Sequence, residues 1–149
     1  MEKKIKILIL SIILILILIG IGLFIWWYGF SPKVISRETI RDFSESSLET
    51  IPKSAEGYQI RYKNSLIHLN KVTFTDSLRA EEFFDEYREK IVKDYGKEEG
   101  DIILDNYKGI MFLAEKNYGV LLKKQENVII AWGPELEKVK SAIEWFFKK

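Results

Sequence analysis

The sequence predicts an α+β protein, with an N-terminal transmembrane helix followed by a small antiparallel-sheet domain packed with two amphipathic helices. Three observations support this prediction. Residues 7–30 of the 149-residue chain contain no charged side chain. The remainder carries short runs of β-branched and aromatic residues separated by turn-forming residues, and two stretches where apolar side chains recur every three or four positions. The length allows one compact domain besides the apolar segment.

The apolar segment at residues 7–30 has the length and composition of a membrane-spanning helix. Sixteen of the nineteen residues from Ile7 to Ile25 are Ile, Leu or Phe, and each favours the bilayer centre by about 0.3 to 0.6 kcal/mol. A helix over residues 7–30 would be about 36 Å long, against a hydrocarbon core of about 30 Å. The segment is therefore long enough to cross a bilayer with some tilt.

Aromatic residues mark the end of this segment. We expect Trp26, Trp27, Tyr28 and Phe30 to lie at the membrane interface, because amphipathic rings favour the headgroup layer. Pro32 follows and is expected to end the helix.

A cleaved signal peptide is the alternative interpretation. Its apolar core is typically about 7 to 15 residues long and precedes a small-x-small site, whereas cleavage at Gly20-Ile21-Gly22 would leave an exposed apolar N-terminus. We therefore predict an uncleaved signal anchor in the cell membrane. Residues 1–6 form a short basic leader with three lysines, so the positive-inside rule predicts a cytoplasmic N-terminus and an extracytoplasmic C-terminal domain.

Residues 31–57 are predicted to be a juxtamembrane linker. Within it, Ile40, Phe43, Ser47 and Ile51 have the spacing of a short amphipathic helix.

Residues 58–149 are predicted to form the α+β domain, beginning with two strands. A change of parity between Ile67-Leu69 and Val72-Phe74 predicts a bulge near Asn70-Lys71. The last four strands have short turns between them and are expected to form an antiparallel meander. The six predicted strands are Tyr58–Lys63, Leu66–Thr75, Ile102–Leu104, Lys108–Glu115, Tyr118–Lys124 and Asn127–Trp132.

Two helices complete the predicted domain. The first has an N-cap at Asp76-Ser77 and an apolar stripe from Ala80 to Tyr95. The second opens at Gly133-Pro134, with Pro134 in the first helical position. Both are expected to cover one face of the sheet. Several strands are apolar on both faces, so the second face also needs a cover: the N-terminal helix, a division of the helices between faces, or a partner protein.

The composition excludes several kinds of functional site. The absence of Cys excludes disulfides, thiolate nucleophiles and cysteine metal sites. His68 is the only histidine and supplies one of the three or four ligands that zinc needs. The net charge of +1 gives no basic footprint for nucleic acid, and no glycine-rich phosphate loop occurs. We assign no catalytic residue, metal or cofactor.

Three remaining features have structural interpretations. His68 has no accompanying G-x-S-x-G motif, and we expect a hydrogen-bonded or edge-strand histidine. An acidic stretch, comprising Glu98, Glu99, Asp101 and Asp105, lacks the spacing of a calcium loop and is expected to be solvated, with residues 97–100 forming a charged loop. Trp145 lies off the apolar stripe of the last helix. Its two interpretations are partial packing against the domain, or exposure with a contact to a protein partner or the headgroup layer.

These observations favour a non-enzymatic, single-pass membrane protein whose domain binds another protein or a small ligand at the cell surface. An accessory subunit of a membrane complex is the first alternative, with a partner completing the two-sided strands. A carboxylate-based hydrolase is the second. The order of an apolar helix and a sheet also resembles type IV pilins, which would imply a surface protein. The chain departs from that pattern because it lacks a prepilin cleavage motif and an acidic residue in the apolar run, and carries Pro32.

Overall fold

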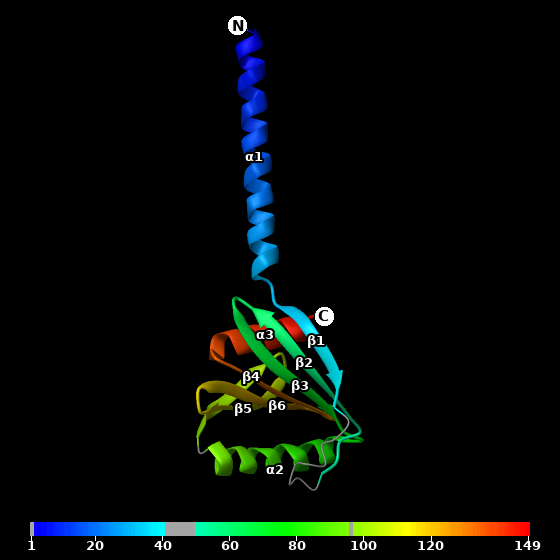
Figure 1. Cartoon of the computed structure of the whole chain (residues 1–149). Helices are drawn as coiled ribbons and strands as arrows, with labels where there is room; N and C mark the ends of the chain where they lie inside the picture. The colour runs from blue at the N-terminus through cyan, green and yellow to red at the C-terminus, as the bar shows by residue number, and fades with distance from the viewer. Residues whose placement is uncertain (1, 41–49, 96) are drawn as a thin grey trace. The chain divides into compact units, whose positions relative to one another are not determined.

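The computed structural model describes residues 2–40, 50–95 and 97–149, and it divides the chain into two compact units at Ser31 and Pro32 (Figure 1). The first unit contains helix α1 (Glu2–Phe30). Its segment Ile5–Trp26 has a mean hydropathy of 3.3 and is long and apolar enough to cross a membrane. The hydroxyl of Ser11 donates a hydrogen bond to the carbonyl oxygen of Ile7 at 2.9 Å, so this polar side chain within the apolar segment is satisfied inside the helix. The helix ends before Pro32, as expected.

The second unit is built on a seven-stranded antiparallel sheet with the order β1-β2-β3-β7-β6-β5-β4. The last four strands form the predicted meander, and its final strand pairs with β3. This pairing joins the meander to the three N-terminal strands in one sheet. The strands are β1 (Lys33–Thr39), β2 (Ser54–Tyr62), β3 (Ser65–Thr73), β4 (Glu98–Leu104), β5 (Tyr107–Ala114), β6 (Asn117–Lys124) and β7 (Asn127–Gly133).

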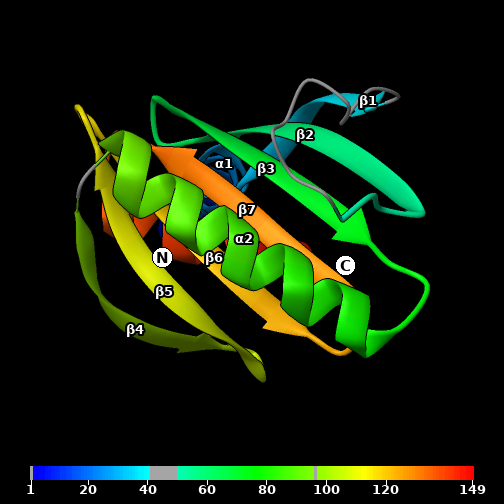
Figure 2. The ribbon, with the colours of Figure 1, turned by 90° about the horizontal axis from the view of Figure 1, so that it is seen from below.

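Two helices lie on opposite faces of the sheet, α2 (Ser77–Tyr95) and α3 (Leu136–Phe147). Figure 2 shows α2 lying across β5, β6 and β7. One hydrophobic core includes Phe83 and Phe84 of α2, and a separate core includes Val139 and Ile143 of α3. The expectation that both helices cover one face is wrong. Their division between the faces explains why the central strands are apolar on both sides.

The parity change in β3 has the same cause. Ile67 and Leu69 belong to the core on the α3 side, whereas Val72 and Phe74 belong to the core on the α2 side. The register of β3 with both neighbouring strands is continuous through Asn70 and Lys71. The predicted bulge is therefore absent from the described strand. The change of parity arises because the buried apolar side chains lie on the α3 side in the first half of β3 and on the α2 side from Val72 onward.

The predicted linker contains an edge strand. Residues Lys33–Thr39 form β1, which is exposed at every position and pairs with β2. A strand without a buried face has no alternating pattern, so its residues carry no signal that predicts it. Strand β2 begins at Ser54, earlier than expected. Most of the helix predicted between Thr39 and Pro52, with Phe43 and Ser47, lies outside the described residues.

The two helix starts differ from each other. The backbone N–H of Arg79 donates to the Asp76 carboxylate at 2.9 Å, which confirms the predicted N-cap of α2. In α3 the N-cap is Glu135 and the helix begins at Leu136, so Pro134 precedes the cap and does not occupy the first helical position.

Candidate functional site

A cavity of about 330 Å³ lies between the C-terminal half of α2 and one end of β5, β6 and β7. This volume is at the lower end of the range of about 300 to 1,000 Å³ for small-molecule sites. Most of the lining is aromatic or aliphatic, with two polar residues, one in the β5–β6 turn and one at the start of β6. The lining residues are Tyr87, Ile91, Tyr95, Phe112, Ala114, Glu115, Asn117, Ile130 and Trp132. We call this cavity the α2 pocket.

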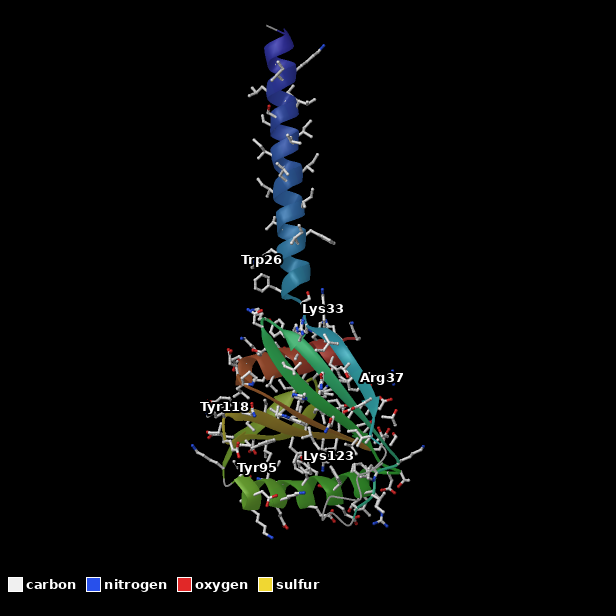
Figure 3. All side chains as sticks on the ribbon, viewed as in Figure 1. Trp26, Lys33, Arg37, Tyr95, Tyr118 and Lys123 are labelled. Atoms are coloured by element: carbon white, nitrogen blue, oxygen red, sulfur yellow. The ribbon has the colours of Figure 1, made fainter. Side chains whose placement is uncertain are left out.

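The helical wall of the α2 pocket follows from helix periodicity. Tyr87, Ile91 and Tyr95 are four residues apart and therefore lie on one face of α2. The last residue of this face is the most exposed: Tyr95 is 52% exposed, whereas Ile91 is 2% exposed and Tyr87 is half-buried. Figure 3 marks Tyr95 at one end of α2 and Lys123 between the sheet and the other half of the helix. The pocket therefore opens at the C-terminal end of α2.

The sheet wall follows from the strand register. Trp132 of β7 is paired with Gly119 of β6, and Gly119 is paired with Phe112 of β5. Because Gly119 has no side chain, the ring of Phe112 lies directly over it. Ile130, which is 1% exposed, forms the deeper part of this wall.

The lining carries one ionisable carboxylate, Glu115, and two phenols. Glu115 is exposed in the turn after β5, where its φ of 55° is left-handed. Burial raises the pKa of Tyr87, and interaction with Tyr95 raises that pKa further. The Tyr87 hydroxyl therefore stays protonated at neutral pH, and it offers a neutral hydrogen-bond donor and acceptor to the pocket.

His68 supports the wall of the α2 pocket from the neighbouring strand. It is paired with Trp132 in the β3–β7 register, and the two rings stack with centroids 5.3 Å apart and an interplanar angle of 11°. The expectation of an edge-strand histidine is wrong, since β3 lies between β2 and β7. The stacking gives this residue a packing role beside the pocket.

The acidic stretch lies largely within β4, so the expectation of a charged loop at residues 97–100 is wrong. Arg88 of α2 holds Glu98 through two contacts, with Nε 3.0 Å from Oε2 and Nη2 2.5 Å from Oε1. Lys97 pairs with Glu99 at 3.0 Å. Within residues 2–40, 50–95 and 97–149, no group of three or more His, Asp or Glu side chains has an arrangement that holds a metal ion.

Trp145 is half-buried and packs against the core under α3. The Nζ of Lys149 lies 4.2 Å from the centroid of its ring. This agrees with the interpretation of partial packing. The two residues that follow Trp145 also make ring contacts: Phe146 meets Tyr58 with centroids 4.7 Å apart, and Phe147 stacks on Tyr107. Its contact with a partner stays a prediction.

The aromatic residues predicted for the membrane interface all lie in α1. Trp26 and Phe30 are exposed, and their rings contact each other with centroids 5.4 Å apart. The side chains of Trp27 and Tyr28 lie outside the described part of the structure. The position of this group at a membrane interface stays a prediction.

The residues of the α2 pocket were not identified from the sequence as a site. Tyr87 and Tyr95 were assigned to the apolar stripe of a helix, and Trp132 to a strand. The nearest signal was the presence of two tyrosines in a stripe that otherwise carries Phe, Ala, Ile and Val, since a phenol prefers to keep its hydroxyl in a polar environment.

Comparisons with known proteins support the fold. No family model and no curated protein matches the sequence. Among solved structures, the chain is similar to the extracellular domain of PknH from Mycobacterium tuberculosis, with 12% sequence identity and a TM-score of 0.51. The similarity covers 79% of this chain and 84% of that chain. At this identity the likeness shows a shared α+β fold.

Proposed function

We propose that the chain is a single-pass membrane protein whose domain, residues 32–149, is a non-enzymatic binding module on the outer side of the membrane. The observation that carries this proposal is the α2 pocket, a preformed cavity of small-ligand size with aromatic walls and a few polar groups at its opening. We propose a small ligand as the molecule that it binds.

The hydropathy and length of α1 support membrane anchoring. The three leader lysines support a cytoplasmic N-terminus, and the similarity to an extracellular domain is consistent with the same orientation. A protein of this kind is expected to remain in the membrane pellet after an alkaline carbonate wash. Release into the supernatant would contradict the anchor.

The absence of Cys makes the orientation easy to test. One variant carries Lys53→Cys in the domain, at an exposed position, and another carries Lys3→Cys in the leader. In intact cells, a membrane-impermeant maleimide is expected to label Lys53→Cys, and to label Lys3→Cys only after permeabilisation. The reverse pattern would place the domain in the cytoplasm.

The pocket itself is tested by filling it. Ala114 lines the pocket and is half-buried, so Ala114→Phe adds a ring to the cavity. A ligand at a hundred times its dissociation constant stabilises its protein by about 2.7 kcal/mol. Compounds that raise the melting temperature of the wild type are expected to lose this effect with Ala114→Phe, while its circular dichroism spectrum is retained. Equal shifts in both proteins would place the binding site elsewhere.

The α2 pocket and the two cores, as far as the described residues show them, do not favour the two alternatives. The accessory-subunit hypothesis rested on strands that are apolar on both faces, and α2 and α3 now account for both covers. A carboxylate-based hydrolase needs a pair of converging carboxylates, whereas the α2 pocket is lined by one, Glu115.

A further inference from the structure

We infer that the α2 pocket takes a small organic cation, and in particular a methylated ammonium group. This inference rests on the proposed binding function and specifies the chemistry of the ligand.

The walls of the pocket offer several aromatic surfaces. Tyr87 and Tyr95 come from α2, and Phe112 and Trp132 come from the sheet opposite. The face of an aromatic ring carries negative potential, so a cation within about 6 Å of a ring centroid is attracted to it, and groups of such rings recognise quaternary ammonium ligands. Aromatic residues on both walls place such surfaces on two sides of a bound group.

The charge of the lining has the sign that a cation requires. Among the nine lining residues, Glu115 is the only one with a charge at neutral pH, and none is basic. Lys116 follows Glu115 in the turn but is exposed and is not one of the lining residues, and two basic side chains on adjacent surfaces hold carboxylates. Lys97 pairs with Glu99 at 3.0 Å, and Lys123 pairs with Glu81 at 2.8 Å. An anionic ligand would therefore find no basic partner among the lining residues.

The apolar part of the lining distinguishes a methylated ammonium from a bare one. A primary ammonium carries three N–H donors that each need an acceptor when they leave water. Ile91 and Ile130 form part of the wall and offer no side-chain acceptor. Methyl groups need no acceptor and pack against these side chains, so a trimethylammonium group matches both the charge and the apolarity of the pocket.

Choline and 3,3-dimethylbutan-1-ol provide the test. The two molecules have the same shape, but the alcohol has a neutral carbon atom where choline has its positively charged nitrogen. Binding is measured by ligand-observed NMR titration on the full chain in a maltoside detergent, which contains no ammonium group. Choline is expected to bind at least ten times more tightly than the alcohol. Tyr95→Leu removes one exposed aromatic surface and is expected to weaken choline about two- to thirty-fold, with a smaller effect on the alcohol.

A matched pair of charge variants separates the pocket from general surface charge. Glu115→Gln removes the carboxylate of the lining and is expected to weaken choline several-fold without affecting the alcohol. Glu89→Gln removes a carboxylate from the exposed side of α2, outside the pocket lining, and is expected to leave both ligands unchanged. Equal effects of the two variants would overturn the role of Glu115.

The outcomes also separate this inference from the proposed function. Equal binding of choline and the alcohol, abolished by Ala114→Phe, would overturn the cation preference and leave a small-ligand pocket. Binding of neutral or anionic compounds without binding of choline would also overturn the cation preference and leave a small-ligand pocket. If no compound of any charge shows binding that Ala114→Phe removes, the proposed function of the pocket fails together with the inference.

Discussion

The substitution Gly119→Ala tests the packing that creates the α2 pocket. A Cβ at this position would lie 2.2 Å from Cζ of Phe112 and 2.4 Å from its Cε2. Carbon atoms in contact are normally about 3.5 to 4.0 Å apart, so the ring has to move by more than about an ångström. Phe112 is 6% exposed, and the empty space beside it is the pocket that it lines. We expect the ring to move into that space.

The expected cost follows from two opposing effects. Inserting a methyl group into a packed core costs about 1 to 3 kcal/mol. Replacing glycine by alanine restricts the unfolded chain and offsets about 0.4 to 1 kcal/mol of this. We therefore expect Gly119→Ala to lower the free energy of unfolding by about 1 to 2 kcal/mol and to weaken ligand binding at the pocket.

Two other strand glycines provide a graded comparison. At Gly57 the nearest atom to an added Cβ is Cγ of Glu38 at 3.2 Å, in an exposed and flexible side chain, so Gly57→Ala is expected to change stability by less than about 0.5 kcal/mol. At Gly109 the added atom would lie only 1.8 Å from the backbone oxygen of Leu121. Since this oxygen belongs to the paired strand β6, Gly109→Ala is expected to cost more than about 4 kcal/mol.

Urea unfolding of residues 32–149 measures these differences, since both hydrophobic cores consist of residues from this unit. Phe112→Leu is expected to relieve the clash, so that the double variant with Gly119→Ala costs less than the sum of the single variants. A neutral Gly119→Ala, or additive costs in the double variant, would refute the proposed contact between Gly119 and the ring of Phe112.

Two further predictions concern the rest of the domain. Asp76→Ala removes the cap that accepts the Arg79 N–H and is expected to cost about 1 kcal/mol in urea unfolding, while Asp76→Asn retains most of the stability; an equal loss in both would contradict the capping role. The pKa of Glu56 is lowered by hydrogen bonds from Tyr58 and from Arg37. Because this pKa is lower in the folded state, the stabilisation is present above the ordinary value of 4.5 and is lost as pH falls through the folded pKa. Glu56→Gln is therefore expected to show a flatter decrease of melting temperature below about pH 4.5 than the wild type, and parallel curves would contradict this linkage.

Local periodicity predicted most of the elements of the fold. The stripe from Ala80 to Tyr95 predicted α2 because its buried members recur at helical spacing, and the cap at Asp76 located its start. The short turns between the last four strands predicted the antiparallel meander, because strands joined by short turns pair with their neighbours in the chain. Strand β1 was missed because an exposed edge strand has no buried face to produce alternation.

The division of the helices between two faces depends on contacts that are distant in sequence. A pattern of apolar residues in β3 shows that Ile67 and Val72 are both buried, but it does not show which helix covers each. The stacking of His68 on Trp132 likewise depends on the pairing of β3 with β7. Such pairing is set by the whole topology, and single-sequence patterns carry little information about it.

The α2 pocket lies where the burial of α2 against the sheet decreases toward the end of the helix. Toward the start of α2, Phe83 is fully buried in the core that includes Leu121 and Val128 of the sheet. Toward its end, Tyr95 faces a part of the sheet that carries the small side chain of Ala114, where the ring of Phe112 lies over Gly119. Tyrosines keep their hydroxyls near water, so this end of α2 remains open. Helical spacing in the sequence identifies which side of α2 is apolar, whereas the depth of the space beneath it depends on the residues of the opposing strands.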